Sequence, residues 1–414
     1  MPMNSELKPK IRFKGFTDDW EQRKLNEVTD VRDGTHDSPK YIELGHPFIT
    51  SKNVKNGYIN YDEIQYISDE DFNEINKRSK VDKNDILFGM IGTIGNIALI
   101  RENPDFAIKN VALIKDIKKI DYLYLYQYLQ SNNIAKQFDE NMDGGTQKFI
   151  ALNKVRNLSI MYPTISEQIQ IGGFLEKLDN LITLHQRKCD KLVELKKSLL
   201  EKMFPQNNSV IPEIRFRGFT DDWEQRKLEE FGKYTGGTSI ESEFEENGKY
   251  KVISIGSYSE TSKYNDQGIR CKVSDKTISK VLNKDDLTMI LNDKTASGNI
   301  IGRVLIIDKS GEYVYNQRTE RIEPNIQEYN PQFLYHMLNA QNIRKKIIKQ
   351  SQGNTQIFVN WTGIQKLEYL VPKMCEQINL AKLIGNIDNL ITLHQRKHDK
   401  LNKIKQSLLN DMFV

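Results

Sequence analysis

The apolar positions of the chain follow two different periods. Between residues 165 and 204, and again between 374 and 413, they recur with the alternating three- and four-residue spacing of a long amphipathic helix. In the first helix this stripe comprises Ile171, Phe174, Leu178, Leu181, Leu192, Leu195 and Leu199. Because one helix cannot bury such a stripe alone, we expect the two helices to pack together, parallel or antiparallel, or each to pack on a partner helix.

Short apolar runs bounded by Gly and Asn predict strands in the rest of the chain. These runs are Pro47–Thr50, Ile86–Gly89, Ile97–Ile100 and Val111–Ile114, followed in the second half by Lys251–Ser254, Leu287–Leu291 and Gly302–Ile307. A shorter helix is predicted from Asp121 to about Gln137, with a counterpart from Pro331 to about Gln350. Thr164 and Glu167 can form a capping box at the start of the first long helix.

Most of the sequence occurs twice. Residues 11–25 return at 214–228 with one Lys-to-Arg change, and residues 178–192 return almost unchanged at 387–401. The offset is 203 positions at the first repeat and 209 from about Asp121 onward, so the second copy gained six residues in its centre. The centres, 36–120 and 239–329, share only a loose pattern. Near-identical edges around divergent centres predict one architecture built twice, with a pseudo-twofold relation.

The predicted fold class is α+β, with two globular domains of mixed α/β, β-rich structure joined by two long antiparallel coiled-coil helices. The expected boundaries are 1–160 for the first domain, 161–204 for the central long helix, 205–213 for a polar linker, 214–369 for the second domain and 370–414 for the C-terminal long helix.

Composition narrows the function classes only slightly. A chain of 414 residues exceeds a single ordinary core, and 60 Lys and Arg against 56 Asp and Glu leave a formal charge of +4, which permits local basic patches. Two basic clusters, 77–83 and 344–349, are more typical of a solvated face than of a binding site. Three scattered cysteines and the absence of a long apolar run predict a soluble protein of a reducing compartment, with no membrane contact.

Catalytic motifs are scarce. There is no Walker A motif, no methyltransferase-type Asn/Asp-Pro-Pro-aromatic run and no His/Cys cluster at metal spacing, so no catalytic residue and no metal ligand is expected. Asp105 followed by Asp116-Ile-Lys118 resembles a loose nuclease pattern that would hold Mg²⁺, but it has no counterpart in the second half. A nuclease acting alone and a coiled-coil scaffold without DNA affinity therefore remain as alternatives.

Two repeated Gly-x-Thr-Gln loops, 144–147 and 353–356, are candidates for DNA contact. Glycine exposes backbone N–H groups, and the hydroxyl and amide side chains can bond phosphates or base edges, although a plain turn explains such loops as well. The full set of candidate DNA-binding residues has hydroxyl, amide, imidazole or cationic side chains: Thr35, His36, Lys52, Asn53, Thr93, Lys109, Thr146, Gln147 and Lys148 in the first half, and Thr238, Lys294, Ser297, Arg318, Thr355 and Gln356 in the second.

One tetrapeptide is identical in both long helices, although burial would not require it. We interpret it as a surface that meets the same partner twice, against the alternative of a helical hairpin with only a stabilising role. Its residues are His185, Gln186, Arg187 and Lys188 in the first helix and His394, Gln395, Arg396 and Lys397 in the second.

The repeated opening segment, the Gly-x-Thr-Gln loops and the Glu-Gln-Ile followed by Leu-Ile-Thr-Leu-His-Gln-Arg-Lys in each helix resemble the specificity (S) subunit of type I restriction-modification enzymes. The resemblance covers essentially the whole chain. It implies two target recognition domains, each reading half of a bipartite, asymmetric site in double-stranded DNA. It also implies that the long helices, about 57 Å each at 1.5 Å per residue, set the spacing and bind two modification subunits.

By the same resemblance, the partners supply the chemistry. Modification subunits methylate adenine with S-adenosylmethionine, and restriction subunits translocate and cut DNA with ATP and Mg²⁺. This chain is then no enzyme and holds no cofactor of its own. We expect it in the cytoplasm, bound to chromosomal DNA within the complex.

Overall fold

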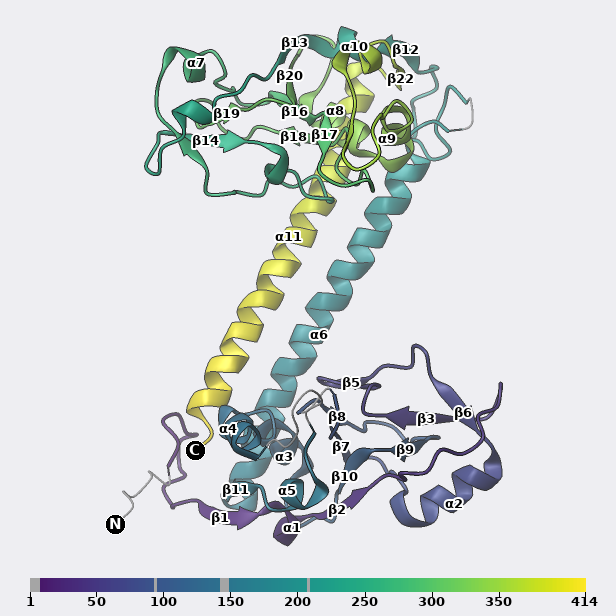
Figure 1. Ribbon diagram of the computed structural model, residues 1–414, viewed down its shortest axis with the longest axis vertical. Helices are drawn as coiled ribbons and strands as arrows, with labels where there is room; N and C mark the ends of the chain where they lie inside the picture. The colour runs from purple at the N-terminus through teal and green to yellow at the C-terminus, as the bar shows by residue number, and fades with distance from the viewer. Residues whose placement is uncertain (1–7, 93–94, 142–148, 207–208) are drawn as a thin grey trace. The chain divides into compact units, whose positions relative to one another are not determined.

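The computed structural model describes residues 8–92, 95–141, 149–206 and 209–414 (Figure 1). The chain divides into two compact units, each of which contains part of both long helices. The first unit comprises residues 1–186 and 396–414, and the second comprises residues 187–395. Within the described residues, no helix is long and apolar enough to cross a membrane.

The first unit is built on a four-stranded antiparallel sheet. In sheet order its strands are β2 (Asp30–Asp33), β10 (Val111–Lys115), β7 (Ile86–Gly89) and β8 (Ile97–Leu99). Alternate side chains enter two cores, with Ile86 and Phe88 in the larger one and Leu87 and Ala98 in the other. Burial on both faces explains why β7, β8 and β10 are apolar runs, whereas β2 at the sheet edge alternates buried and half-buried residues.

A three-stranded sheet lies on one side of this four-stranded sheet, and the short helices of the larger core lie on the other (Figure 1). The three strands, in sheet order, are β6 (Gln65–Ile67), β3 (His46–Thr50) and β9 (Ala107–Lys109), with β3 and β9 parallel. The remaining strands of this unit form two two-stranded sheets: β4 (Val54–Lys55) pairs with β5 (Tyr58–Ile59), and β1 (Glu21–Lys24) pairs with β11 (Ser159–Tyr162). The helices are α1 (Leu25–Val28), α2 (Asp69–Ser79), α3 (Tyr122–Tyr128), α4 (Asn132–Asn141) and α5 (Leu152–Arg156).

The second unit repeats this topology. Its four-stranded sheet has the order β13 (Gly232–Gly236), β20 (Thr319–Pro324), β16 (Leu287–Ile290) and β18 (Val304–Ile306). Its three-stranded sheet has the order β15 (Arg270–Cys271), β14 (Tyr250–Ile253) and β19 (Tyr313–Tyr315), with β14 and β19 parallel. The remaining strand pairs are β12 (Glu224–Lys227) with β22 (Glu368–Val371), and β17 (Asn292–Asp293) with β21 (Ile357–Phe358).

The helices of the second unit follow the same order. They are η1 (Leu228–Phe231), η2 (Glu241–Glu243), η3 (Ile255–Ser257), α7 (Asp275–Ile278), α8 (Pro331–Asn339), α9 (Gln341–Ile348) and α10 (Trp361–Ile364). The divergent centres therefore fold alike, and the predicted fold class is confirmed.

The two shorter helices were predicted as continuous, and this was wrong. The first is divided into α3 and α4 because Gln130 and Ser131 donate backbone hydrogen bonds three residues back, to Gln127 and Tyr128, which closes α3. The second is divided at Ala340, whose backbone is extended (φ −62°, ψ 135°). Apolar spacing continues across both breaks, so the pattern could not show them.

The long helices, α6 (Ile165–Lys202) and α11 (Met374–Asp411), contain 38 residues each. In the second unit the C-terminal part of α6 packs antiparallel on the N-terminal part of α11: the Lys196 Nζ lies 2.6 Å from the Asp388 Oδ1, and Cys189 packs against Ile387 and Ile391. In the first unit Lys405 Nζ lies 2.6 Å from Asp179 Oδ1. Both ion pairs join equivalent positions 209 residues apart, so the repeat supplies the same contact twice.

The predicted apolar stripe of α6 is only partly buried. Phe174, Leu181 and Leu195 are 41%, 45% and 47% exposed, whereas Ile171 and the unpredicted Leu175 are fully buried. The reason is that the N-terminal part of α6 turns a different face toward the core of its own domain, where Ile171 and Leu175 lie. The pairing of α6 with α11 therefore leaves part of the wide apolar stripe of α6 exposed to solvent.

The repeated opening segments fix the start of each long helix. Arg12 donates to both carboxylate oxygens of Glu167 at 2.7 and 2.8 Å, and Arg215 donates to both oxygens of Glu376 at 2.8 Å. Both glutamate side chains are almost fully buried. Glu167 thus serves an ion pair rather than the capping box expected with Thr164.

The C-terminal ends of the long helices complete the cores. Phe413, which follows α11, packs in the first unit with its ring centroid 5.6 Å from that of Tyr124 and 5.2 Å from that of Tyr128. Phe204, which follows α6, packs in the second unit at 6.1 Å from Trp223 and 6.0 Å from Phe333.

Candidate nucleic-acid interface

In the first unit, the turn after β2 lies beside the end of β9. Thr35 forms a parallel bridge with Lys109, and Lys109 donates a hydrogen bond to Ser38. His36 Nδ1 lies 2.7 Å from Asn110 Oδ1. The structure therefore brings together Thr35, His36 and Lys109, three residues that the sequence nominated separately.

Asp33 connects two exposed donors at this turn. His36 Nε2 lies 3.1 Å from Asp33 Oδ2, and Arg78 at the end of α2 forms an ion pair with the other oxygen. The Asp33 side chain is 11% exposed, whereas those of His36 and Arg78 are 65% and 69% exposed. One nearly buried carboxylate thus orients two cationic or polar groups that face solvent, a geometry suited to base edges or phosphates.

Lys52 and Asn53 lie in the next turn, between β3 and β4. Asn53 is 8% exposed, and its side chain accepts from the Thr50 backbone N–H at 3.0 Å and donates to the Asn60 carbonyl at 3.1 Å. The Asn53 amide is therefore used within the turn, while Lys52 is exposed. The remaining candidates of the first half, Thr93, Thr146, Gln147 and Lys148, lie outside the described residues.

The second unit has an equivalent turn with different residues. Gly237 donates its backbone N–H to Thr319 at 2.8 Å, and a Cβ on Gly237 would lie 2.0 Å from the Asn316 carbonyl oxygen, so only glycine allows this approach. Thr238 is exposed next to it, and Arg318 is exposed with a left-handed backbone (φ 67°). Thr238 and Arg318 of the second unit thus occupy a corner equivalent to the one where Thr35 and His36 lie in the first unit.

The other four candidates of the second half lie on two loops that the structure pairs. Asp293 of β17 pairs with Ile357 of β21, which places loop 292–299 against loop 353–357. Asp293 accepts from the backbone N–H groups of Thr295 at 2.9 Å and Ile300 at 3.1 Å, which holds the first loop in shape. The candidates Lys294, Ser297, Thr355 and Gln356 are all exposed there.

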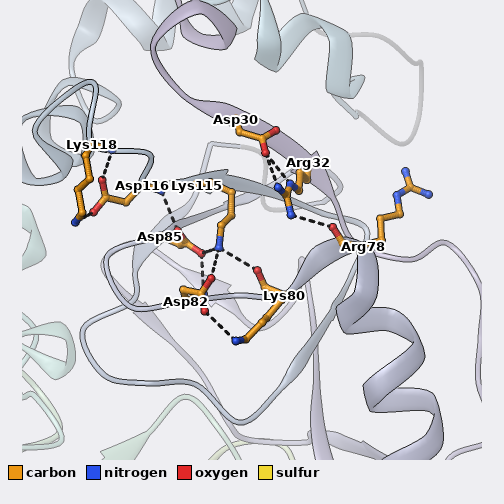
Figure 2. A network of polar contacts seen from close by, with 9 residues as sticks. All are labelled: Asp30, Arg32, Arg78, Lys80, Asp82, Asp85, Lys115, Asp116 and Lys118. Atoms are coloured by element: carbon orange, nitrogen blue, oxygen red, sulfur yellow. Dashed lines mark hydrogen bonds and ion pairs between the residues drawn. The ribbon is translucent and has the colours of Figure 1, made fainter.

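The acidic residues of the nuclease-like pattern have structural partners. Asp105 Oδ1 lies 2.8 Å from His46 Nδ1, and Asp116 forms an ion pair with its neighbour Lys118. Figure 2 shows Asp116 in a network in which Lys115 Nζ lies 2.6 Å from Asp82 and Asp85. Hydrogen bonding to Lys115 holds the pKa of Asp82 below its usual value. Over the part of the chain that the structure describes, no cluster of His, Cys, Asp or Glu could hold a metal ion.

The shared surface of the long helices is broader than the tetrapeptide. Arg187, Lys188, Arg396 and Lys397 are exposed, Gln395 is exposed as well, and His185, Gln186 and His394 are half-buried. Four leucines that sequence reasoning assigned no role there are also exposed: Leu181, Leu184, Leu390 and Leu393, at 44–45%. The sequence signal for them is that each leucine recurs at the equivalent position of the other long helix. The structure shows that both positions are exposed.

Known proteins share this architecture. Residues 17–194 and 220–403 match the family model described as the type I restriction modification DNA specificity domain. The chain belongs to this family. It is a DNA specificity subunit of a type I restriction-modification system and not a catalytic subunit, which confirms the predicted family and sets aside the lone nuclease and the scaffold without DNA affinity.

The specificity subunit resembles curated relatives over nearly its whole length. It is 26% identical over 386 residues to the type I restriction enzyme MjaVIII specificity subunit of Methanocaldococcus jannaschii, covering 90% of this chain and 89% of that one. It is 26% identical over 197 residues to the EcoBI specificity subunit of Escherichia coli, covering 45% and 41%. The crystal structure of the S subunit from M. genitalium has the same fold, with a TM-score of 0.67 at 15% identity over 98% of this chain and 99% of that one.

Proposed function

We propose that each unit presents one target recognition domain, residues 1–160 or 214–369, to one half of a bipartite site in double-stranded DNA. The observation that carries this proposal is one corner of the fold built twice with different side chains. The first unit has Thr35 and His36 there, and the second has Thr238 and Arg318. Different donors on one frame would read different bases, so the recognised site is asymmetric.

The paired loops of the second unit form the other part of its reading surface. Gln356 and Thr355 present an amide and a hydroxyl beside Lys294. An amide side chain can bond an adenine edge through two atoms, while lysine suits a guanine edge or a phosphate. By the repeat, we assign the same role in the first unit to Thr146, Gln147 and Lys148 together with Thr93.

The long helices, residues 161–204 and 370–414, set the distance between the half-sites and dock two modification subunits. This part of the proposal rests on residues that are identical in both copies: the exposed leucines at 181 and 184 with their twins at 390 and 393, and the following His-Gln-Arg-Lys, whose arginine and lysine are exposed. Exposed apolar residues beside cationic ones are typical of a docking surface. Two copies of one surface would bind two copies of one partner.

The chemistry then belongs to the partners. Modification subunits would hold S-adenosylmethionine and methylate adenine, and restriction subunits would use ATP and Mg²⁺ to translocate and cut DNA. The specificity subunit would act with them on chromosomal DNA in the cytoplasm.

Sequencing of methylated bases tests the assignment of the two surfaces. Cells that produce the modification subunits with the Gln356→Ala variant should lose discrimination at one half-site, and cells with the His36→Ala variant should lose it at the other. Each variant is the matched control for the other. Loss of discrimination at both half-sites from either substitution would refute the assignment.

A further inference from the structure

One cavity of the second unit includes part of the loop that we assign to DNA contact. Its volume is about 370 Å³, and it lies between α9, the end of α8 and loop 292–299. The polar and cationic residues that line it include Ser297, Asn299, Arg303, Gln341, Arg344 and Lys345.

Arg344 is a buried cation without a carboxylate partner. It is 6% exposed and donates to three backbone carbonyls, those of Ile301 at 2.9 Å, Gly298 at 3.2 Å and Asn299 at 2.9 Å. Loss of solvation lowers its pKa to about 10, and the neighbouring positive charge of Arg303 adds to this effect. The sequence had placed Arg344 in a basic cluster typical of a solvated face.

Arg303 supplies a second guanidinium group to the same cavity, and its side chain is half-buried. It donates to Ser262 Oγ at 2.9 Å and to the Asn299 carbonyl at 3.0 Å, and burial lowers its pKa. In the described part of the chain, neither Arg303 nor Arg344 forms a direct ion pair with a carboxylate. Buried cations are normally paired, and here the carboxylates of Glu260 and Asp293 act on the two guanidinium groups only through their charge.

Two carboxylates among the described residues offset part of this charge. Glu260 lines the cavity and accepts a hydrogen bond from Asn299 Nδ2 at 2.8 Å, and the charge of the buried Asp293 partly offsets the lowering of the Arg344 pKa, whereas Lys345 adds a third cation. Three cations against two anions still favour a bound anion. Guanidinium groups present several N–H donors in a fixed plane, which matches phosphate, and the Ser297 hydroxyl and Gln341 amide can donate to further oxygens.

We propose that the Arg303–Arg344 cavity binds a phosphate group. Its source is either the DNA backbone next to the half-site of the second domain or a free phosphate compound. The DNA source rests on the proposed function, because Ser297 belongs both to the cavity and to the loop assigned to DNA. The first unit has Asn96 and Ala135 at the equivalent positions, so the site is a property of the second half and not of the repeated frame.

The test uses the specificity subunit in complex with its modification subunits. With a duplex that carries the recognised site, Arg303→Gln should weaken binding about tenfold at 0.1 M salt and lower the salt-dependence slope by about one, because one phosphate contact is lost. The methylated sequence should not change. Arg226→Gln, which removes a surface arginine paired with Glu224, is the matched control and should leave both quantities unchanged.

A titration with inorganic phosphate distinguishes the sources. If the ligand is a free phosphate compound, phosphate raises the thermal stability of the DNA-free complex but not that of the Arg303→Gln complex, while DNA affinity and salt slope are the same for both. An Arg303→Gln complex with normal DNA affinity, normal salt slope and the wild-type response to phosphate would overturn the proposal. Failure of the proposed function would look different, because the wild-type complex would then bind every duplex equally.

Discussion

The packing of Phe413 predicts that the segment after α11 stabilises the first unit selectively. The side chain is 4% exposed and packs edge-on against Tyr124 and Tyr128 at centroid distances of 5.6 and 5.2 Å. Truncation of a buried phenylalanine to alanine costs about 3–5 kcal/mol, through lost apolar contact and the cavity left behind. Since whole domains are stable by only about 5–15 kcal/mol, Phe413→Ala should remove a large share of the stability of the first unit.

Hydrogen exchange measured by mass spectrometry separates the two units in one sample. About 3–5 kcal/mol corresponds to an increase of roughly 10²- to 4 × 10³-fold in the exchange of core amides, since about 1.4 kcal/mol is tenfold. The increase should be confined to the first unit and should include strands β7 and β10 and helix α3, which share the core with Phe413.

The equivalent substitution in the second unit is the matched control. Phe204 packs against Trp223 and Phe333, so Phe204→Ala should accelerate exchange in β16 and α8 and leave the first unit protected. Unchanged exchange in the first unit of Phe413→Ala, or equal acceleration in both units, would refute the reasoning.

Four further outcomes follow from the contacts described above. Arg215→Ala leaves the buried carboxylate of Glu376 without its partner, so the second unit should lose about 3–5 kcal/mol in urea unfolding; a loss under about 1 kcal/mol would contradict this. Burial raises the pKa of Glu320 from 4.5 to about 7, so the native state keeps a proton that the unfolded chain releases, and stability falls as pH rises through this window. Glu320→Gln should flatten this fall in thermal unfolding, and an unaltered pH profile would count against it. Asp33→Asn removes the negative charge and replaces one of the two oxygens that hold His36 and Arg78 with an NH2 donor, so base preference should relax at one half-site only in the methylated sequences, and relaxation at both would sink the idea. Four residues inserted into each long helix add about 6 Å, about two base pairs, so the spacer should change while the half-sites stay the same; altered half-sites would be incompatible with helices that only set spacing.

The sequence predicted β7, β8, β10, β16 and β18 of the four-stranded sheets because burial on both faces leaves unbroken apolar runs. It missed β2, β13 and β20, which carry charged or exposed residues. Strands β1 and β12 share the sequence Glu-Gln-Arg-Lys and are polar and mostly exposed, so hydrophobic periodicity had nothing to detect. Helix α2 was missed for a similar reason: its only buried residue is Ser79. The breaks between the short helices come from backbone geometry, which the apolar spacing does not encode.

The sequence could predict the candidate site only where its residues lie close together along the chain. Thr35 and Thr238 stand in repeated Gly-Thr turns, and the repeat pointed to them directly. Asp33 and Arg78 are 45 positions apart, and their ion pair exists only because α2 returns to β2. Arg344 looked like a surface cation in a basic run, and only the fold shows that it is buried.

Sequencing of the methylated bases in a host that carries this subunit with its modification subunits tests the central claim most directly. The account predicts adenine methylation at one bipartite, asymmetric sequence with a fixed spacer, absent when this subunit is omitted. Methylation that is unchanged by its omission, or that follows a continuous or palindromic sequence, would contradict the claim that two different domains on one frame each read half of the site.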